Sequence, residues 1–221
     1  MSIISLFRMP KWPKIEFNEI KKRSRVLVID DGVFQYMELF KNDGYVVEKW
    51  DDVEDLGKLE SGDYDIILLD IQGVGRKQSV DQGLGVLKHL RKTAPAQIII
   101  AFSNADWSLK YQDFFNMADH VLAKGSDYVD FKRIVDEYLK KRFSLEYYIT
   151  KIDKTVNAEL GPSVELKTLV KKAILKNKIN KLQIFLEDRL NDPDTIKKVL
   201  SYVNVAIGLF NTIKTFIPQS Y

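Results

Sequence analysis

Carboxylates, a hydroxyl and an ammonium follow apolar runs of this sequence at positions where they could meet. Asp30 and Asp31 follow the first run, Asp70 the second, Ser103 the third and Lys124 the fourth. An acidic pair with a third carboxylate makes a cage of hard oxygen ligands, the kind that Mg²⁺ prefers. Without a cation, each pair of carboxylates would repel by about 4 kcal/mol at 4 Å and an effective dielectric of 20. The sequence therefore predicts a Mg²⁺ site.

The same residues predict a phosphoryl-transfer site. Asp70 would attack phosphorus as a nucleophile, and the metal and Lys124 would neutralise the equatorial oxygens of the phosphoryl group. Ser103 would donate a hydrogen bond to one of those oxygens. Catalysis would then come from positioning and electrostatics.

The elements that must position these side chains alternate between strands and helices. Four runs are apolar throughout, which is typical of strands buried on both faces, and a fifth run is rich in β-formers. These five runs are Val26–Ile29, Tyr45–Trp50, Ile66–Leu69, Ile98–Phe102 and Val121–Ala123. Segments with helical spacing lie between and after them, for example Phe34–Phe40, Leu84–Leu90 and Phe131–Leu139. The alternation predicts an α/β fold with a doubly wound, five-stranded parallel sheet and right-handed crossovers.

The sheet topology makes the polar residues at the strand ends informative. In open α/β sheets, ligands bind beyond the carboxyl ends of the strands, where the strand order reverses. All the candidate residues named above should therefore converge on one edge.

The sequence after Arg142 changes to helix-forming segments rich in Lys, Leu and Ile. Gly161-Pro162 is a strong break, and Asn191-Asp192-Pro193-Asp194 supplies a cap followed by a helix-starting proline. We expect three or four helices that bury amphipathic stripes, of which one is formed by Leu166, Leu169, Val170, Ala173 and Ile174.

Composition limits the remaining possibilities. The chain has no cysteine, which excludes disulfides, thiolate metal sites and cysteine nucleophiles and fits a reducing compartment. Neither the N-terminal sequence nor the stretch 199–213 has the pattern of a signal peptide or the length of a membrane span, so we expect a cytoplasmic protein. Residues 26–143 hold fifteen Lys/Arg and twenty-one Asp/Glu, whereas 1–25 and 144–221 are both basic. The basic ends are either solvated surface or a surface for an anionic partner.

Five sequence blocks resemble the signature regions of the receiver domains of two-component response regulators, in family order. They are RVLVIDD, DIILLDI, GLGVLKHLRK, IIIAFSNA and HVLAK. The resemblance implies that Asp30 and Asp31 are the metal-binding acidic pair and that Asp70 is the phosphoacceptor. Ser103 and Lys124, 21 residues apart, match the family's hydroxyl residue and lysine.

The resemblance also implies a fold, a cofactor and partners. The main-chain carbonyl of Gln72 would complete the Mg²⁺ shell with the carboxylates. The chain would comprise a basic N-terminal extension (1–24), a flavodoxin-like receiver domain (25–142) and a helical output or assembly region (143–221). It would be a phosphoacceptor and not an enzyme acting on a separate substrate. Its phosphoryl donor would be a histidine kinase or phosphotransfer protein. The region 143–221 lies outside the resemblance, and its apolar stripes and basic charge suggest a homodimer or another protein as its partner, with nucleic acid as the runner-up.

Several positions depart from the family pattern and keep an alternative open. Val121 stands at the family's aromatic switch position, and Gly125 replaces the proline that usually follows the lysine. The loop after Asp70 is longer than usual, and although its Gly73, Gly75, Arg76 and Lys77 suggest phosphate binding, it does not fit a P-loop, so we expect a flexible insertion. The alternative is a pseudo-receiver that acts as a phosphorylation-independent interaction module. A Mg²⁺-dependent phosphatase ranks last, because Gln72 stands where its second aspartate would be.

Overall fold

The computed structural model describes residues 15–104 and 116–214, which form two compact units. One unit, Glu16–Arg142, contains the sheet, and the other contains the helices that follow Phe143. The sheet unit begins with helix α1 (Phe17–Arg23), whereas the sequence assigned these residues to an N-terminal extension. Ile20 of α1 is buried, which shows why this helix belongs to the sheet unit.

The expected five-stranded parallel sheet is confirmed. Its strands are β1 (Arg25–Ile29), β2 (Val46–Trp50), β3 (Ile66–Asp70), β4 (Ile98–Ser103) and β5 (His120–Ala123). They pair in the order β2-β1-β3-β4-β5, and every pairing is parallel. This is the flavodoxin-like order, in which the strand order reverses between β1 and β3. All residues of β3 and β4 are buried, as the uninterrupted apolar runs predicted.

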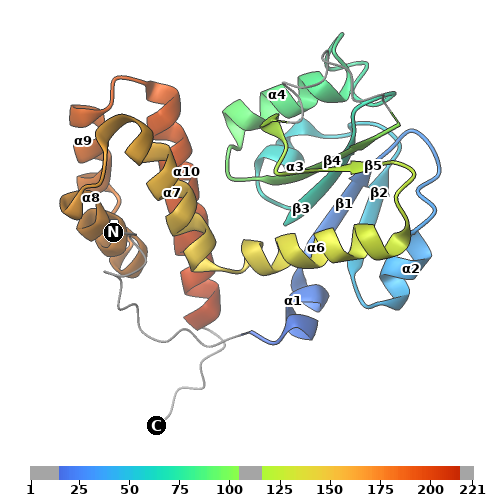
Figure 1. Ribbon diagram of the computed structural model, residues 1–221, viewed down its shortest axis with the longest axis horizontal. Coiled ribbons are helices and arrows are strands. Elements are labelled where there is room, and N and C mark those ends of the chain that lie inside the picture. Colours follow the sequence, from blue (N-terminus) through green and yellow to red (C-terminus); the bar gives the residue numbers. More distant parts are fainter. Residues whose placement is uncertain (1–14, 105–115, 215–221) are drawn as a thin grey trace. The chain divides into compact units, whose positions relative to one another are not determined.

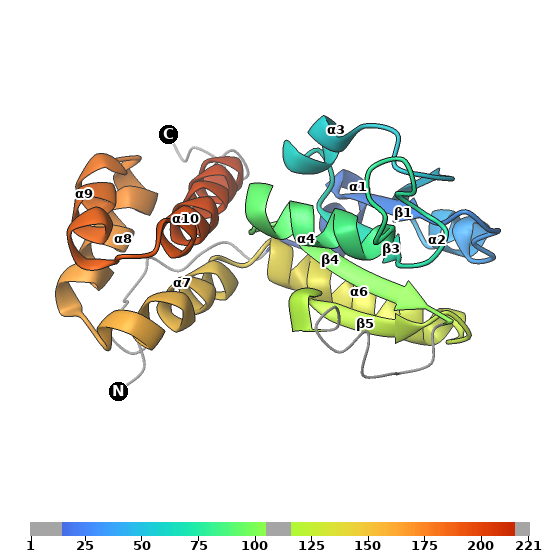
Figure 2. The ribbon, with the colours of Figure 1, turned by 90° about the horizontal axis from the view of Figure 1, so that it is seen from above.

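Helices cover both faces of the sheet (Figure 1). On one face lie α3 (Leu56–Glu60) and α4 (Gly83–Thr93); on the other lie α1, α2 (Met37–Asn42) and α6 (Tyr128–Arg142). Figure 2 shows α3 and α4 in front of the strands. Residues 105–115, between β4 and β5, lie outside the described part.

The two faces of the sheet have different cores. The core under α3 and α4 is mainly aliphatic, with Leu59, Ile67 and Leu87 fully buried. The opposite face is aromatic, since the Phe102 ring of β4 lies 5.9 Å from both Phe34 and Phe131. Burial of such side chains provides most of the stabilisation of the fold, at about 1.5–3 kcal/mol for each.

The helical unit contains four described helices, at the upper limit of the three or four expected. They are α7 (Leu145–Leu160), α8 (Val164–Lys176), α9 (Asn180–Arg189) and α10 (Pro193–Lys214). Helix α10 contacts the other three, and α8 also contacts α9. The breaks fall at Gly161-Pro162 and at Pro193, where the sequence placed them. Leu166, Val170, Ala173 and Ile174 of the predicted α8 stripe are buried, and Leu169 is half-buried. No described helix has the length and apolar character to cross a bilayer.

Candidate functional site

The parallel register brings the ends of β1, β3, β4 and β5 to one edge of the sheet. Ile29 pairs with Leu69, Asp70 with Phe102, and Ser103 with Ala123. Asp30 and Asp70 are 0% and 2% exposed, so two carboxylates are withdrawn from water beside each other. Burying charged groups is costly unless they are paired.

Lys124 supplies the counter-charge for both buried carboxylates. Its Nζ lies 2.9 Å from Asp30 Oδ1 and 2.7 Å from Asp70 Oδ2. A single ammonium thus lies between carboxylates from two neighbouring strands. Residue 124 is placed for this by the loop after β5, where its backbone N–H donates to the Ser103 carbonyl at 2.9 Å.

Backbone donors fix the orientation of the same two carboxylates. The Gly32 N–H donates to Asp30 Oδ1 at 2.9 Å, and the Gln72 N–H donates to Asp70 Oδ1 at 3.1 Å. The main chain of Asp30 is held as well, because its carbonyl accepts from Lys49 Nζ at 2.7 Å. These contacts make the two carboxylates rigid features of the site.

Asp30 also has an oxygen without a partner. Its Oδ2 is buried and accepts no hydrogen bond from the described residues. Buried polar atoms normally have a partner, so an unsatisfied one calls for an explanation such as an ion. Asp30, Asp31 and Asp70 each offer an oxygen ligand, and these atoms lie within 4.8 Å of one another. An all-oxygen donor set with one unsatisfied ligand atom fits Mg²⁺.

Burial disfavours the charged forms of both Asp70 and Lys124, whereas their mutual attraction favours them. Burial raises the pKa of Asp70 above its usual value, although Lys124 and the Gln72 N–H both favour the ionised form. Burial by itself would lower the pKa of Lys124, but the hydrogen bonds and charges of Asp70 and Asp30 raise it. Lys124 is therefore a fixed cation at neutral pH.

The predicted site residues are largely brought together. The carboxyl edge of the sheet holds five of them, namely Asp30, Asp31, Asp70, Ser103 and Lys124. Ser103 is nearly buried there, at 8% exposed. The proposed metal-binding role of the Gln72 carbonyl and the phosphoryl-binding role of the Ser103 hydroxyl stay predictions.

The loop between β3 and α4 contributes contacts that the sequence did not predict. A Cβ on Gly73 would lie 2.0 Å from Asp31 Oδ2, so the loop backbone runs directly against this carboxylate. Arg76 Nη2 lies 3.7 Å from the same oxygen. The glycines and basic residues of the loop had suggested phosphate binding, but in this structure the Arg76 cation lies beside a carboxylate of the acidic cluster.

The same loop is anchored at several points, although the sequence suggested a flexible insertion. Val74 is fully buried, and the Gly73 N–H donates to the Gln82 side chain at 2.8 Å. The Gly75 N–H donates to Asp52, and Gln78 Nε2 donates to the Val53 carbonyl at 2.9 Å. These contacts join the loop to the one that follows β2.

Val121 and Phe102 define the surroundings of the cation. Val121 is half-buried and packs against the core under α4, where the family pattern has an aromatic ring. An aromatic ring is present on the neighbouring strand instead, since Lys124 Nζ lies 5.9 Å from the centroid of Phe102. At that distance a cation–π attraction contributes about 0.5–1 kcal/mol.

Comparison with known proteins finds similar solved structures only. No protein-family model and no curated protein matches the chain. A response regulator receiver domain protein (CheY-like) from Methanospirillum hungatei is 25% identical, with a TM-score of 0.44, over 53% of this chain and 94% of that one. The response regulator TrrA of Thermotoga maritima, in complex with Mg²⁺-BeF, is 27% identical, with a TM-score of 0.42, over 52% and 98%. TrrA in complex with the histidine kinase ThkA matches at 26% identity, with a TM-score of 0.42, over the same shares. The similar structures are thus response regulator proteins, the family whose receiver domains the sequence blocks resemble.

Proposed function

We propose that this chain is a response regulator of a phosphorelay, which accepts a phosphoryl group on Asp70 in a site that holds Mg²⁺. The observation that carries the proposal is the Lys124 ammonium placed between two buried carboxylates, one of which keeps an unpartnered oxygen. A structural ion pair alone would leave that oxygen unexplained. The similar solved structures are response regulators, and one of them was solved with Mg²⁺-BeF, which is consistent with the proposal.

The proposed reaction transfers a phosphoryl group from an activated donor. A carboxylate oxygen of Asp70 forms a bond to phosphorus, while the bond from phosphorus to the donor's leaving group breaks and its electron pair goes to that group. The product is an aspartyl phosphate. Asp70 reacts as a carboxylate, the form that Lys124 and the Gln72 N–H favour against the effect of burial, so no proton has to leave it during the transfer.

Residues of this chain supply the orientation. The Gln72 N–H holds Asp70 so that the carboxylate cannot rotate away, and Lys124 offers a cation for an equatorial oxygen. Ser103 would donate its hydroxyl to another equatorial oxygen. Asp30, Asp31 and Asp70 would hold the metal with the Gln72 carbonyl, and a bound Mg²⁺ would neutralise charge on the phosphoryl oxygens.

The proposed partners follow from this chemistry. The donor would be a histidine kinase or phosphotransfer protein in the cytoplasm, and the four helices α7–α10 would form the output or assembly region. Among the residues described, Val164 and Ile184 are the large hydrophobic side chains that this unit exposes. The other apolar side chains of its described helices are largely buried within the unit, which leaves little apolar surface there for a homodimer interface.

Intact-mass spectrometry of the full chain with acetyl phosphate and MgCl₂ tests the proposal. We expect the mass of one phosphoryl group to be added, to vanish in Asp70→Asn and to persist in Asp63→Asn, an exposed aspartate outside the site. EDTA should suppress labelling. Unchanged mass under conditions that label another response regulator would reject the phosphoacceptor role and favour the pseudo-receiver. Labelling of Asp70→Asn would place the phosphoryl group elsewhere.

A further inference from the structure

A run of lysines without acidic residues distinguishes the middle of the helical unit. Residues 166–186 hold six lysines and no Asp or Glu. Four of them, Lys172, Lys176, Lys178 and Lys181, are exposed; Lys171 is half-buried, and Lys167 is only 9% exposed. This cationic surface, residues 167–181 of α8 and the start of α9, is not used by the proposed phosphoryl chemistry.

The four exposed lysines of this surface lack the ion pairs that several lysines of the sheet unit make with described residues. In the sheet unit, four lysines each form an ion pair with a carboxylate within 3.2 Å, namely Lys22, Lys41, Lys88 and Lys141. In contrast, none of the four exposed lysines of the cationic surface has a hydrogen bond or ion pair with the described residues. Their charges are therefore not neutralised within that part of the chain.

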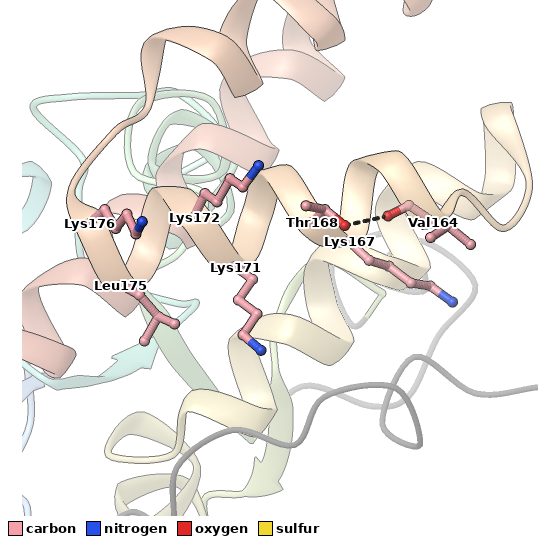
Figure 3. A pocket seen from close by; sticks show the side chains of 7 residues that line it. All are labelled: Val164, Lys167, Thr168, Lys171, Lys172, Leu175 and Lys176. Carbon is pink, nitrogen blue, oxygen red and sulfur yellow. Dashed lines mark hydrogen bonds between the residues drawn. The ribbon is translucent and has the colours of Figure 1, made fainter.

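Helix geometry arranges the charges in two rows. Lys167 and Lys171, and likewise Lys172 and Lys176, are four residues apart, so each pair lies on one side of α8. Figure 3 shows the two pairs pointing to different sides of the helix, with Leu175 on the side of Lys171. Together they line a hollow of about 350 Å³. From Lys167 to Lys176 the rows span nine residue steps, about 14 Å along the helix axis.

Lys167 adds a second indication of an anionic ligand. This side chain is nine-tenths buried, lines the hollow and has no ion pair among the described residues. A lysine that buries its stem normally brings its ammonium to water or to a counter-charge. An anion bound over the hollow would provide that counter-charge.

The composition of the surface selects among anionic partners. Protein–protein interfaces are depleted in lysine and depend on central aromatic or Arg anchors. Phe185 of α9 is buried and cannot serve as such an anchor, so the surface does not fit a protein partner. A membrane-surface helix needs a free apolar face, but Val170 and Ile174 of α8 are buried within the unit. Single-stranded nucleic acid is bound with exposed aromatic rings, which the described parts of α8 and α9 do not offer. A duplex backbone needs only cations.

We propose that the cationic surface of α8 and α9 binds the phosphate backbone of a nucleic-acid duplex without reading its sequence. This inference is independent of phosphorylation at Asp70, since it rests on the helical unit alone. The four exposed lysines would neutralise about four phosphates. Because each contact contributes about −0.9 to the slope of log K against log salt, that slope should be about −3.6.

Fluorescence anisotropy with the full chain tests this inference. The probes are a labelled 20-base-pair DNA duplex of arbitrary sequence and the matching RNA duplex, each titrated at 50, 100 and 200 mM NaCl. With a slope of about −3.6, affinity should fall about 150-fold over this range. Lys172→Gln/Lys176→Gln/Lys178→Gln should reduce the slope by about 3, since each lysine removed costs about one unit. The two probes decide which sugar backbone is preferred.

A matched triple variant separates local from overall charge. Lys58→Gln/Lys77→Gln/Lys92→Gln removes the same charge from exposed lysines of the sheet unit that make no ion pair with described residues. It should bind the duplex like the wild type, and both triple variants should keep the wild-type urea midpoint. Equal loss in both variants, or no binding at 50 mM NaCl, would overturn the proposal. Tighter binding to polyglutamate or to phosphatidylserine vesicles than to either duplex would also overturn it.

Discussion

The contact between Gly73 and Asp31 allows a sharp test of the metal site. Gly73 has a φ of +85°, and a Cβ added there would lie 2.0 Å from Asp31 Oδ2 and 2.3 Å from its Cγ. Gly44 has nearly the same φ, +84°, but nothing lies within 4 Å of its added Cβ. Gly73→Ala and Gly44→Ala therefore share the backbone strain and differ in the clash with Asp31, a proposed metal ligand.

The magnitudes follow from this geometry. A left-handed backbone costs a residue with a Cβ about 1–2 kcal/mol, so both variants should lose that much stability. At a urea m-value of about 2 kcal/mol/M, the midpoint would fall by about 0.5–1 M in each. In Gly73→Ala the Asp31 carboxylate must also move by more than about 1 Å to restore ordinary contact. Its side chain is 44% exposed and can swing toward solvent, so this adds little to the loss of stability.

Metal affinity should separate the two variants. Mg²⁺ demands near-ideal geometry at about 2.0–2.1 Å, so a displaced carboxylate no longer serves as a ligand. We expect Gly73→Ala to bind Mg²⁺ about 10- to 100-fold more weakly, as when other supports of metal ligands are altered. Isothermal titration calorimetry would measure this, and Gly44→Ala should match the wild type. Wild-type affinity in Gly73→Ala would refute Asp31 as a ligand, and equal weakening in both would mean that strain alone is responsible.

Three further perturbations test other parts of the site and fold. Lys124→Ala leaves two buried carboxylates without their cation, so urea unfolding in EDTA should show a loss of about 3–5 kcal/mol, much of which MgCl₂ restores; no restoration would argue against a shared metal site. Arg76→Gln should tighten Mg²⁺ binding about two- to fivefold, because an exposed guanidinium no longer competes for Asp31, whereas Lys77→Gln should have no such effect in the same calorimetric titration. Burial lowers the pKa of His120, so its contribution to stability is present above the unfolded value of 6.5 and is lost as pH falls through the folded value. Urea unfolding between pH 7.5 and 5 should therefore show a smaller acid loss in His120→Leu than in the wild type, and an equal loss would contradict this assignment.

The sheet was predictable because its central strands β1, β3 and β4 are buried on both faces, whereas the edge strand β5, expected from its apolar run to be buried as well, is only partly so. Apolar runs such as Ile66–Leu69, which alternate with helical segments along the chain, are best explained as buried strands of a parallel sheet. The topology of such a sheet then brings the polar residues at the strand ends together. Local helix boundaries were less predictable. The predicted helix from Phe34 begins only at Met37, because Phe34 serves instead to fill the aromatic core against Phe131.

Contacts between distant loops could not be predicted from local pattern. The clash that a Cβ on Gly73 would make depends on where two separate loops pass each other, and nothing near either residue signals it. The anchoring of the loop after β3 has the same origin, since Asp52 and Val53 belong to another loop. A glycine-rich insertion is consistent with flexibility until its long-range partners are known. Lys172 and Lys176 of α8 were visible in the sequence, but their lack of ion pairs with described residues was not.

Charge balance at the sheet edge links the metal to the phosphoryl group. The three carboxylates of the cluster face two cations, Lys124 and Arg76, which leaves an excess negative charge in a largely desolvated place. An incoming phosphoryl donor is itself anionic, so it would be repelled from the metal-free site. A bound divalent ion would reverse the sign of the excess. A phosphoryl group on Asp70, which would bring about −1.5 to −2 charges in place of the carboxylate, would return it to near neutrality. The arrangement therefore favours an order in which the metal would bind before the phosphodonor.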